Sequence, residues 1–243
     1  MALPYPPEEM RALVGRPALD LFLEEPSYPP HLTRRVLDLG CGCGRIARWL
    51  LTQTPRPTRY LGLDIHAGMI EWCQSNLAAE AFDYIRQDVA NPGLNPTGTL
   101  GAAPIPAEDG SFSLIIAISF FTHLIESQVP QYLDEIARVI AADGTLHSTF
   151  FLFDKRGFPM MQEFQNALYI NADDPTNAVI YDRAWLLNEL SERNLAVRWV
   201  GPPDIQGFHW HLWIGKGGEH VKFPRDLAPV GRLPPPLLGD PHR

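Results

Sequence analysis

Cysteine is scarce in this sequence of 243 residues: there are three, and no two of them form a Cys-x-x-Cys pair. A disulfide framework is therefore not expected, and the odd number of cysteines is typical of a protein in a reducing cytoplasm. The sequence also lacks a signal-peptide pattern at its N-terminus. Its longest apolar run, residues 112–121, is too short to span a bilayer, so no membrane association is predicted.

Clusters of basic residues are missing as well. The formal net charge is −8, the isoelectric point is near 5.4, and no expected helix face gathers Lys and Arg side chains. Since phosphate neutralisation is the largest sequence-independent contribution to nucleic-acid binding, a nucleic-acid partner is not expected. The charge balance does not exclude a small anionic substrate. No internal repeat is found, and nothing in the sequence indicates an oligomeric state.

What the sequence does have is one glycine-rich stretch. Residues 36–39 are typical of a buried strand, glycines follow at positions 40, 42 and 44, and an apolar-periodic helix begins directly after them. Glycine allows positive φ and close backbone approach, and the N–H groups of a helix start can face a ligand. A dinucleotide fingerprint would need its third glycine at position 45, which is Arg45. The stretch therefore predicts a ligand loop, and it disfavours a nucleotide-dependent oxidoreductase.

Strand and helix patterns alternate along the rest of the chain. This alternation predicts a parallel sheet with helices on both faces, and a short connection near residue 205 predicts that the last two strands form an antiparallel hairpin. Residues 91–110, rich in proline and glycine, are expected to form a loop. The expected strands are 35–39, 60–64, 82–87, 112–119, 145–151, 195–200 and 207–215. The expected helices are 8–14, 18–23, 44–53, 67–79, 130–141, 159–168 and 183–193.

Three acidic residues, Asp38, Asp64 and Asp88, stand at the ends of three successive expected strands. In a doubly wound sheet, ligands bind beyond the carboxyl ends of the strands. One such acid alone would be interpreted as a strand-end cap or a solvated turn residue. Three of them together with the glycine loop indicate a ligand site.

The pattern Asp-x-Gly-x-Gly-x-Gly from Asp38 to Gly44 resembles motif I of the class I S-adenosylmethionine (SAM) methyltransferases. Residues 106–112, 119–124 and 132–140 resemble the segments that surround the fourth and fifth strands of that family. The resemblance covers residues 31–153 well, and the rest only in outline. It implies an α/β fold, a Rossmann-like doubly wound sheet of seven strands that is mostly parallel and has an antiparallel C-terminal hairpin strand. It also implies SAM as the cofactor.

The resemblance implies a role for each motif residue. Asp64 would bind the ribose hydroxyls, and Asp88 the adenine amino group. Asp38 would lie near the methionine part, where a negative charge favours the sulfonium. The residues that it assigns to cofactor binding are Asp38, Gly40, Cys41, Gly42, Gly44, Asp64, Ile65, Asp88, Val89 and Ser119.

The candidate catalytic residue is His123, which follows the fourth strand beside the expected position of the methyl group. Methyl transfer to a hydroxyl needs a base, and histidine is suited to that role. The alternative is that His123 caps or packs against the following helix. His209 and His211 lie on one strand face; they could line an acceptor pocket, or they are partly exposed residues beside Trp213. Two histidines without a third ligand do not indicate a metal site.

These observations predict a methyltransferase domain at residues 31–217, preceded by a proline-rich extension or cover (1–30) and followed by a proline-rich tail (218–243). Within the domain, the irregular and aromatic-rich segment 154–183 is expected to form a lid or part of the acceptor pocket. The predicted function is transfer of a methyl group from SAM to an oxygen, or less favourably a nitrogen, of a small-molecule acceptor. The alternative is a non-catalytic SAM-fold protein that binds a cofactor or a partner.

Overall fold

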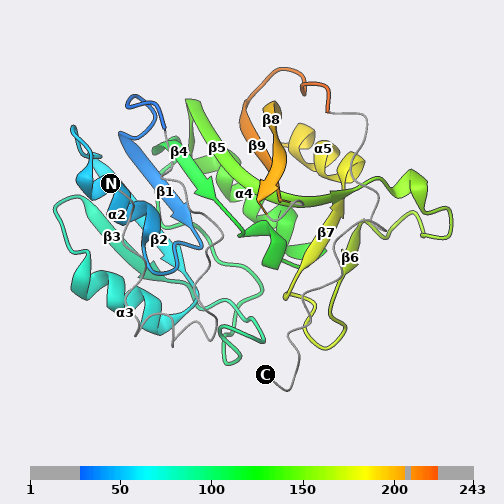
Figure 1. Ribbon diagram of the computed structural model, residues 1–243, viewed down its shortest axis with the longest axis horizontal. Coiled ribbons are helices and arrows are strands. Elements are labelled where there is room, and N and C mark those ends of the chain that lie inside the picture. Colours follow the sequence, from blue (N-terminus) through cyan, green and yellow to red (C-terminus); the bar gives the residue numbers. More distant parts are fainter. Residues whose placement is uncertain (1–27, 206–208, 224–243) are drawn as a thin grey trace.

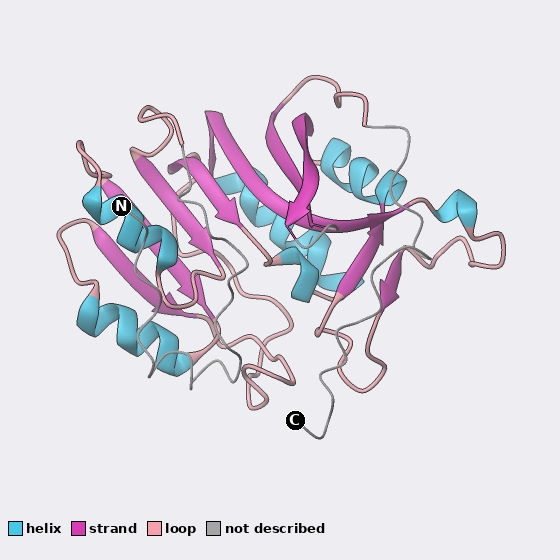
Figure 2. Ribbon diagram, in the orientation of Figure 1, coloured by secondary structure: helices cyan, strands magenta, loops and turns pink. Residues whose placement is uncertain are grey.

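A computed structural model of the chain describes residues 28–205 and 209–223, apart from the side chains at 202–205. These residues form one twisted sheet with helices on both faces (Figure 1, Figure 2). The strands are β1 (Arg35–Leu39), β2 (Arg59–Asp64), β3 (Phe82–Arg86), β4 (Phe112–Ala117), β5 (Ile140–Phe153), β6 (Ala167–Tyr169), β7 (Val179–Asp182), β8 (Leu195–Ile205) and β9 (His209–Lys216). The helices are α2 (Arg45–Thr52), α3 (Ala67–Asn76), α4 (Val129–Val139) and α5 (Arg183–Glu192), with short 3₁₀ turns η1 (Phe121–His123), η2 (Glu126–Gln128) and η3 (Lys155–Gly157).

The centre of the sheet is parallel, in the order β3-β2-β1-β4-β5. Strand β9 pairs antiparallel with β5, and β8 pairs antiparallel with β9, so the predicted closing hairpin is confirmed for the described residues. The predicted α/β fold class, with a mostly parallel sheet, is confirmed as well.

Along each strand, side chains point alternately to the two faces of the sheet. Because helices cover both faces, both sets of side chains are buried at its centre. Leu37 and Leu39 of β1 face one apolar cluster, which also contains residues of α4 and α5. Val36 faces the opposite cluster, which contains residues of α2 and α3. This arrangement leaves the carboxyl ends of β1, β2 and β4 together at one edge of the sheet, where the glycine loop begins.

Two strands, β6 and β7, were not predicted, and the predicted helix at 159–168 is wrong. Strand β7 pairs parallel with the last residues of β5, and β6 pairs antiparallel with β7. The side chain of Glu126 also accepts hydrogen bonds from the backbone and side-chain nitrogens of Asn166. These long-range contacts hold the segment in turns and a short strand, and they override its local helix preference.

Some predictions fall on residues that the structure does not describe. The expected helices at 8–14 and 18–23 lie outside the described residues, as do most of the predicted N-terminal extension and of the C-terminal tail. Within residues 28–205 and 209–223, no helix is long and apolar enough to cross a membrane.

Candidate functional site

The glycine loop connects β1 to α2 with all three of its glycines at positive φ. The φ angles are +70° at Gly40, +53° at Gly42 and +68° at Gly44. The backbone nitrogens of Gly40 and Cys41 donate to the carbonyl of Leu63, at 2.8 and 3.0 Å. These bonds fix the loop against the carboxyl end of β2, as expected for a ligand loop that must keep one conformation.

Gly42 and Gly44 differ in what a side chain would meet. A Cβ atom at Gly44 would lie 2.4 Å from Cδ1 of Leu77 and 3.1 Å from Sγ of Cys73, so this glycine allows α3 to pack against the loop. A Cβ atom at Gly42 would have only Sδ of Met69 within 4 Å, at 3.9 Å. Gly42 therefore faces a space that the described side chains leave open, as a loop that cradles a ligand requires.

Asp64 lies at the end of β2 with its carboxylate beside the loop. Oδ2 accepts a hydrogen bond from the nitrogen of Gly42 at 2.8 Å, and Oδ1 accepts one from the nitrogen of His66 at 2.9 Å. Burial raises the pKa of Asp64, and these two bonds oppose that rise. A carboxylate has about four acceptor positions. The backbone bonds leave acceptor capacity on this carboxylate for a hydroxyl, so the residues present fit a ribose.

Asp88 is held by a loop that follows β3. Its carboxylate accepts hydrogen bonds from Oγ1 of Thr99 at 2.7 Å and from Nδ2 of Asn95 at 3.3 Å. The bond from Thr99 is the main reason that the pKa of Asp88 is lowered. Thr99 and Asn95 lie in the loop that the sequence predicted without assigning a role to these residues, and they keep Asp88 ionised and able to accept from an amino group.

Asp38 is 4% exposed, on the face of β1 that carries α2. Its Oδ2 atom accepts a hydrogen bond from the hydroxyl of Tyr60 at 2.8 Å. Burial raises its pKa to about 6, against the opposing effects of that bond and of the nearby Arg45. Its predicted contact with the methionine part of the cofactor stays a prediction, as do those of Ile65, which is partly exposed, and Val89, which is buried.

Ser119 follows β4 in a strained conformation, with φ at +56°. Its backbone nitrogen donates to Oγ1 of Thr149 at 2.8 Å, which ties the end of β4 to β5. Positive φ at a residue other than glycine is uncommon and costs on the order of 1–3 kcal/mol. The contact with Thr149 compensates for part of that cost and holds the backbone of Ser119 at the edge where the predicted cofactor residues meet.

His123 ends η1, and its Nδ1 atom lies 2.9 Å from the carbonyl oxygen of Thr176. A carbonyl only accepts, so Nδ1 of His123 carries the proton and donates it. In the neutral side chain the basic nitrogen is then Nε2. A base whose tautomer is fixed by a second group is the arrangement that proton transfer requires. Thr176, which the sequence did not indicate, comes from the predicted lid segment 154–183.

His209 and His211 begin β9 on the same face, beside β5. His209 is 3% exposed, so the interpretation that it is a partly exposed strand residue is wrong. Its ring lies edge-on to that of Phe151, with the centroids 4.5 Å apart. Burial lowers its pKa to about 4, with further contributions from His211 and His123. The structure therefore brings His209 and His123 close enough to interact electrostatically, although 86 residues separate them in the sequence.

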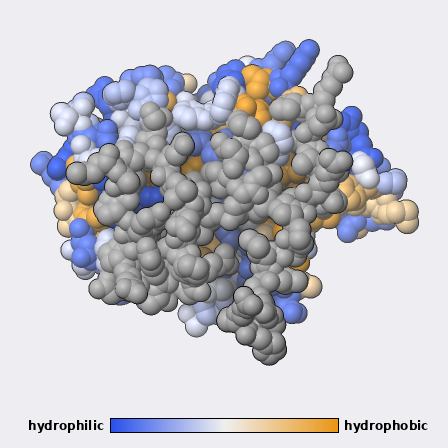
Figure 3. Space-filling model, in the orientation of Figure 1, coloured by the Kyte–Doolittle hydropathy of each residue, from blue (hydrophilic) through white to orange (hydrophobic). Residues whose placement is uncertain are grey.

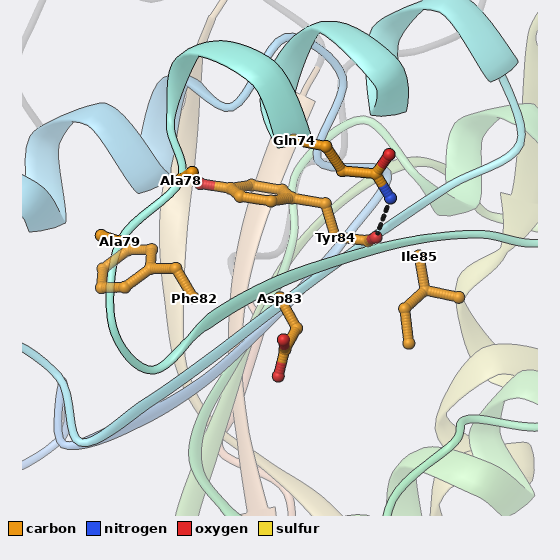
Figure 4. Close-up of a pocket in the computed structure, with 7 residues that line it drawn as sticks. All are labelled: Gln74, Ala78, Ala79, Phe82, Asp83, Tyr84 and Ile85. Atoms are coloured by element: carbon orange, nitrogen blue, oxygen red, sulfur yellow. Dashed lines mark hydrogen bonds between the residues drawn. The ribbon is translucent and has the colours of Figure 1, made fainter.

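No metal centre is found in this region: among the described side chains, no three His, Cys, Asp or Glu residues are arranged to hold an ion. A surface cavity of about 260 Å³ lies elsewhere, between α3 and the edge strand β3 (Figure 4). It is lined by Gln74, Ala78, Ala79, Phe82, Asp83, Tyr84 and Ile85. None of these residues belongs to the predicted cofactor set, so the cavity is separate from the candidate site.

Two histidines with lowered pKa values, the buried His209 and the half-buried His147, give the fold a definite response to acid. Burial lowers the pKa of His147 on β5 to about 3, as it lowers that of His209. Above about pH 6.5, the pKa of histidine in the unfolded chain, such a histidine makes its full contribution to the free energy of unfolding. That contribution is lost as the pH falls towards the lower pKa of the folded state. We expect the unfolding free energy of His147→Gln to fall less steeply than that of the wild type between about pH 6.5 and pH 4.5. Urea denaturation across this range should show a difference of up to about 1.4 kcal/mol per pH unit.

Asp38 provides the control with the opposite sign. Its pKa is raised from 3.8 to about 6, so the stability that it contributes is present at low pH and is lost as the pH rises through 6. In the wild type, protonation of Asp38 therefore stabilises the fold on acidification and opposes the effect of the histidines. Asp38→Asn lacks this gain, so its free energy of unfolding falls more steeply on acidification than that of the wild type. Parallel pH curves for the wild type and both variants would contradict the assigned protonation states.

Comparison with known proteins shows which proteins this chain is similar to. Residues 36–144 match the model of a methyltransferase domain family. The phthiotriol/phenolphthiotriol dimycocerosates methyltransferase 1 of Mycobacterium ulcerans (strain Agy99) is 30% identical over 113 residues, which are 46% of this chain and 36% of that protein. The aligned part therefore spans little more than a third of the length of this relative.

Solved structures show the same fold at low sequence identity. An SAM-dependent methyltransferase from Mesorhizobium loti superposes with a TM-score of 0.53 at 14% identity, over 77% of this chain and 93% of the other. Geranyl diphosphate C-methyltransferase from Streptomyces coelicolor A3(2), solved with Mg²⁺, geranyl diphosphate and S-adenosyl-L-homocysteine, superposes with a TM-score of 0.54 at 12% identity, over 77% of each chain. Identities this low establish the fold and leave the acceptor open.

Proposed function

Because residues 36–144 match a methyltransferase domain family and the chain has the fold of SAM-dependent methyltransferases, we propose that it is a class I enzyme that transfers a methyl group from SAM to an oxygen of a small-molecule acceptor. The family match agrees with two predictions made from the sequence, that the protein is a methyltransferase and that SAM is its cofactor. The nature of the acceptor is the new part of the proposal. The observation that carries it is the hydrogen bond from His123 to Thr176, which supplies a base of fixed tautomer.

The cofactor is held by the residues of the glycine loop and the strand ends. Asp64 retains acceptor capacity for the ribose hydroxyls, and Gly42 leaves the adjacent space open. Asp88, ionised and ordered by Thr99, accepts from the adenine amino group. SAM supplies an electrophilic methyl group when it is bound here. The role of this chain is to hold that methyl group in line with the acceptor. Such positioning lowers the barrier to the displacement.

His123 moves the proton in this scheme. The acceptor hydroxyl gives its proton to Nε2 of His123 as the oxygen–carbon bond forms and the carbon–sulfur bond breaks. The carbonyl of Thr176 accepts from Nδ1 throughout, so it keeps the ring in place and favours the imidazolium that results. A base next to the acceptor favours oxygen over an amine nitrogen, which can lose its proton after transfer.

A small-molecule acceptor is supported by charge and by the relatives. The chain carries a net charge of −8, which disfavours nucleic acid. The mycobacterial relative is named for phthiotriol and phenolphthiotriol dimycocerosates, and its name mentions neither a protein nor a nucleic acid.

Release of S-adenosylhomocysteine (SAH) tests this proposal. The purified chain would be incubated with SAM and a panel of phenols, alcohols, hydroxy acids and amines, and SAH would be quantified by mass spectrometry. We expect SAH to form with at least one hydroxyl acceptor. Binding of SAH without turnover on any member of the panel would favour the alternative of a non-catalytic SAM-binding protein.

The segment 154–183 is proposed to cover the acceptor site. Thr176 connects it to His123 and also to Asn91, whose Nδ2 atom donates to Oγ1 of Thr176 at 3.0 Å. Elsewhere in this segment, Met160 is 89% exposed and Phe164 is 76% exposed. At the projecting end of the molecule in Figure 3, apolar side chains lie at the surface among hydrophilic ones. Exposed apolar side chains beside a site are a feature of segments that close over a ligand.

Limited proteolysis measures this closure. We expect protease to cut first within residues 158–166, which form turns without strand pairing, and SAH to slow the cutting there by several-fold. Cleavage at the exposed residues 142–143 of β5, where the pairing with β4 shifts register, serves as the internal control, because these residues are outside the predicted cofactor set. Equal protection of both places with and without SAH would count against a lid.

A further inference from the structure

One turn connects the cofactor side of the candidate site to the side that carries the base. Residues 91–95 follow β3, and the backbone groups of Asn91 and Asn95 pair with each other, nitrogen to carbonyl oxygen, at 3.1 and 2.9 Å. Both asparagines are buried. The side chain of Asn95 belongs to the cofactor side, because its Nδ2 atom donates to the carboxylate of Asp88 and to the carbonyl of Val89.

The side chain of Asn91 is directed to the other side, towards the segment that holds His123. Its Oδ1 atom accepts from the backbone nitrogens of Gly93 and Leu94, at 3.0 and 2.9 Å. These two bonds fix which end of the amide is the oxygen, because a backbone N–H can only donate. Nδ2 of Asn91 is therefore the atom that donates to Oγ1 of Thr176, at 3.0 Å.

Thr176 uses each of its polar groups at this junction. Its hydroxyl donates to Oδ1 of Asp174 at 2.6 Å, and its backbone nitrogen donates to the same oxygen at 3.1 Å. Its carbonyl accepts from Nδ1 of His123 at 2.9 Å. The ring of the candidate base is therefore held by a residue whose own side chain is held by Asn91, and the chemistry of each group defines the donor and the acceptor.

Resting on the proposed function, we propose that Asn91 is a positioning residue that couples the cofactor site to the base. The proposed function gives the adenine amino group to Asp88, which is in the same loop as Asn91. A cofactor bound at Asp88 stabilises this loop, and Asn91 transmits that stabilisation to Thr176. The carbonyl of Thr176 then holds the ring of His123 in its working orientation. Such alignment matters because a displacement of about 1 Å can cost on the order of a hundredfold in rate.

Two variants interrupt this connection at different points. Asn91→Asp keeps the oxygen that accepts from the two backbone nitrogens of the turn, but it replaces the donor to Thr176 with an acceptor. The single hydroxyl hydrogen of Thr176 cannot serve this acceptor and Asp174 together. Thr176→Val removes Oγ1 and retains the carbonyl that accepts from His123. The matched control is Asn171→Asp, because Oδ1 of the exposed Asn171 also accepts from two backbone nitrogens.

Hydrogen–deuterium exchange measures the coupling without any acceptor. The backbone amides of residues 91–100 and 171–177 are followed by mass spectrometry in the free protein and with SAH. We expect SAH to slow exchange several-fold in both segments of the wild type and of Asn171→Asp. In Asn91→Asp and Thr176→Val, the slowing should persist at 91–100 and disappear at 171–177. Slowing at 171–177 that survives in either of these variants, or that is absent from the wild type, would overturn the proposal.

Methyl transfer supplies the second measurement, with a hydroxyl acceptor that the panel identifies. We expect kcat of Asn91→Asp and of Thr176→Val to fall about ten- to a hundredfold, whereas KM for the acceptor stays nearly unchanged. Combining either substitution with His123→Ala should lower kcat no further than His123→Ala does alone, because the connection acts through that ring. An unchanged kcat in Asn91→Asp, or a further fall of the same size in the His123→Ala background, would overturn the positioning role.

The two measurements separate this proposal from the proposed function. If no acceptor of the panel is methylated, the proposed function fails, whereas the exchange of residues 171–177 still decides whether Asn91 couples the two sides of the site. If an acceptor is methylated and that exchange does not respond to SAH, methyl transfer stands and the coupling through Asn91 fails.

Discussion

Gly42→Val is expected to abolish binding of the cofactor without unfolding the protein. The Cβ position of Gly42 meets only one described atom within 4 Å, so the added methyl groups would project into the open space that the cofactor is proposed to fill. We expect the affinity for SAH to fall by more than about a hundredfold, equivalent to roughly 3 kcal/mol. Isothermal titration calorimetry measures the affinity, and thermal unfolding of the same sample shows whether the variant is folded.

Gly110→Val is the matched control for this substitution. Gly110 also has a positive φ, +64°, and its Cβ position meets no atom within 4 Å, against one at Gly42. Both variants therefore carry a similar backbone strain, but Gly110 precedes β4 at the opposite end of the strand from the site. Loss of SAH binding in both variants would mean that strain alone is responsible, and the position of Gly42 would then have no special meaning.

His123→Ala is expected to lower the methyl-transfer rate by roughly 10²–10⁴-fold, which is the usual contribution of a general base. The affinity for SAH should change little, because the proposed role of the imidazole is towards the acceptor. The reaction to be followed is SAH formation from any hydroxyl acceptor that the panel identifies. A rate that is retained per folded molecule, together with a lower melting temperature, would give His123 the structural role that the sequence analysis left open.

His123→Asn separates the two roles more sharply. The amide nitrogen of asparagine can donate to the carbonyl of Thr176 in place of Nδ1, but the side chain has no basic nitrogen in place of Nε2. We expect this variant to regain most of the stability lost in His123→Ala and to remain as slow in catalysis. Recovery of both stability and rate would show that His123 acts only through its bond to Thr176.

The glycine loop and the strands beside it could be predicted from the sequence because their signals are local. Strand β1 was predicted with its observed bounds, and the acids at the ends of β1 and β2 stand next to the loop that they support. A glycine at positive φ and a continuous apolar strand each depend on a few consecutive residues. The exclusion of a dinucleotide fingerprint rested on one position, Arg45, and the comparisons agree with it.

The acceptor side could not be predicted in the same way, because its contacts join distant parts of the chain. Tyr28 and His147 are 119 residues apart, and His123 reaches Thr176 across 53 residues. Their meeting depends on the registers of β5 with β9 and with β7, which no local pattern specifies. For the same reason the predicted helix at 159–168 was wrong, since β7 pairs with the last residues of β5 and β6 pairs in turn with β7.

The central claim, that the carboxylate of Asp64 and the glycine loop form a SAM site, is tested most directly by titrating SAH into the wild type and Asp64→Ala. The substitution removes the acceptors for both ribose hydroxyls, a loss of about 1–3 kcal/mol, or roughly five- to 150-fold in affinity. Asp83→Ala, which removes an exposed carboxylate from β3, should bind as the wild type does. The predicted result is one SAH per chain, weakened in Asp64→Ala alone. No binding to the wild type, or equal affinity in a folded Asp64→Ala, would contradict the account.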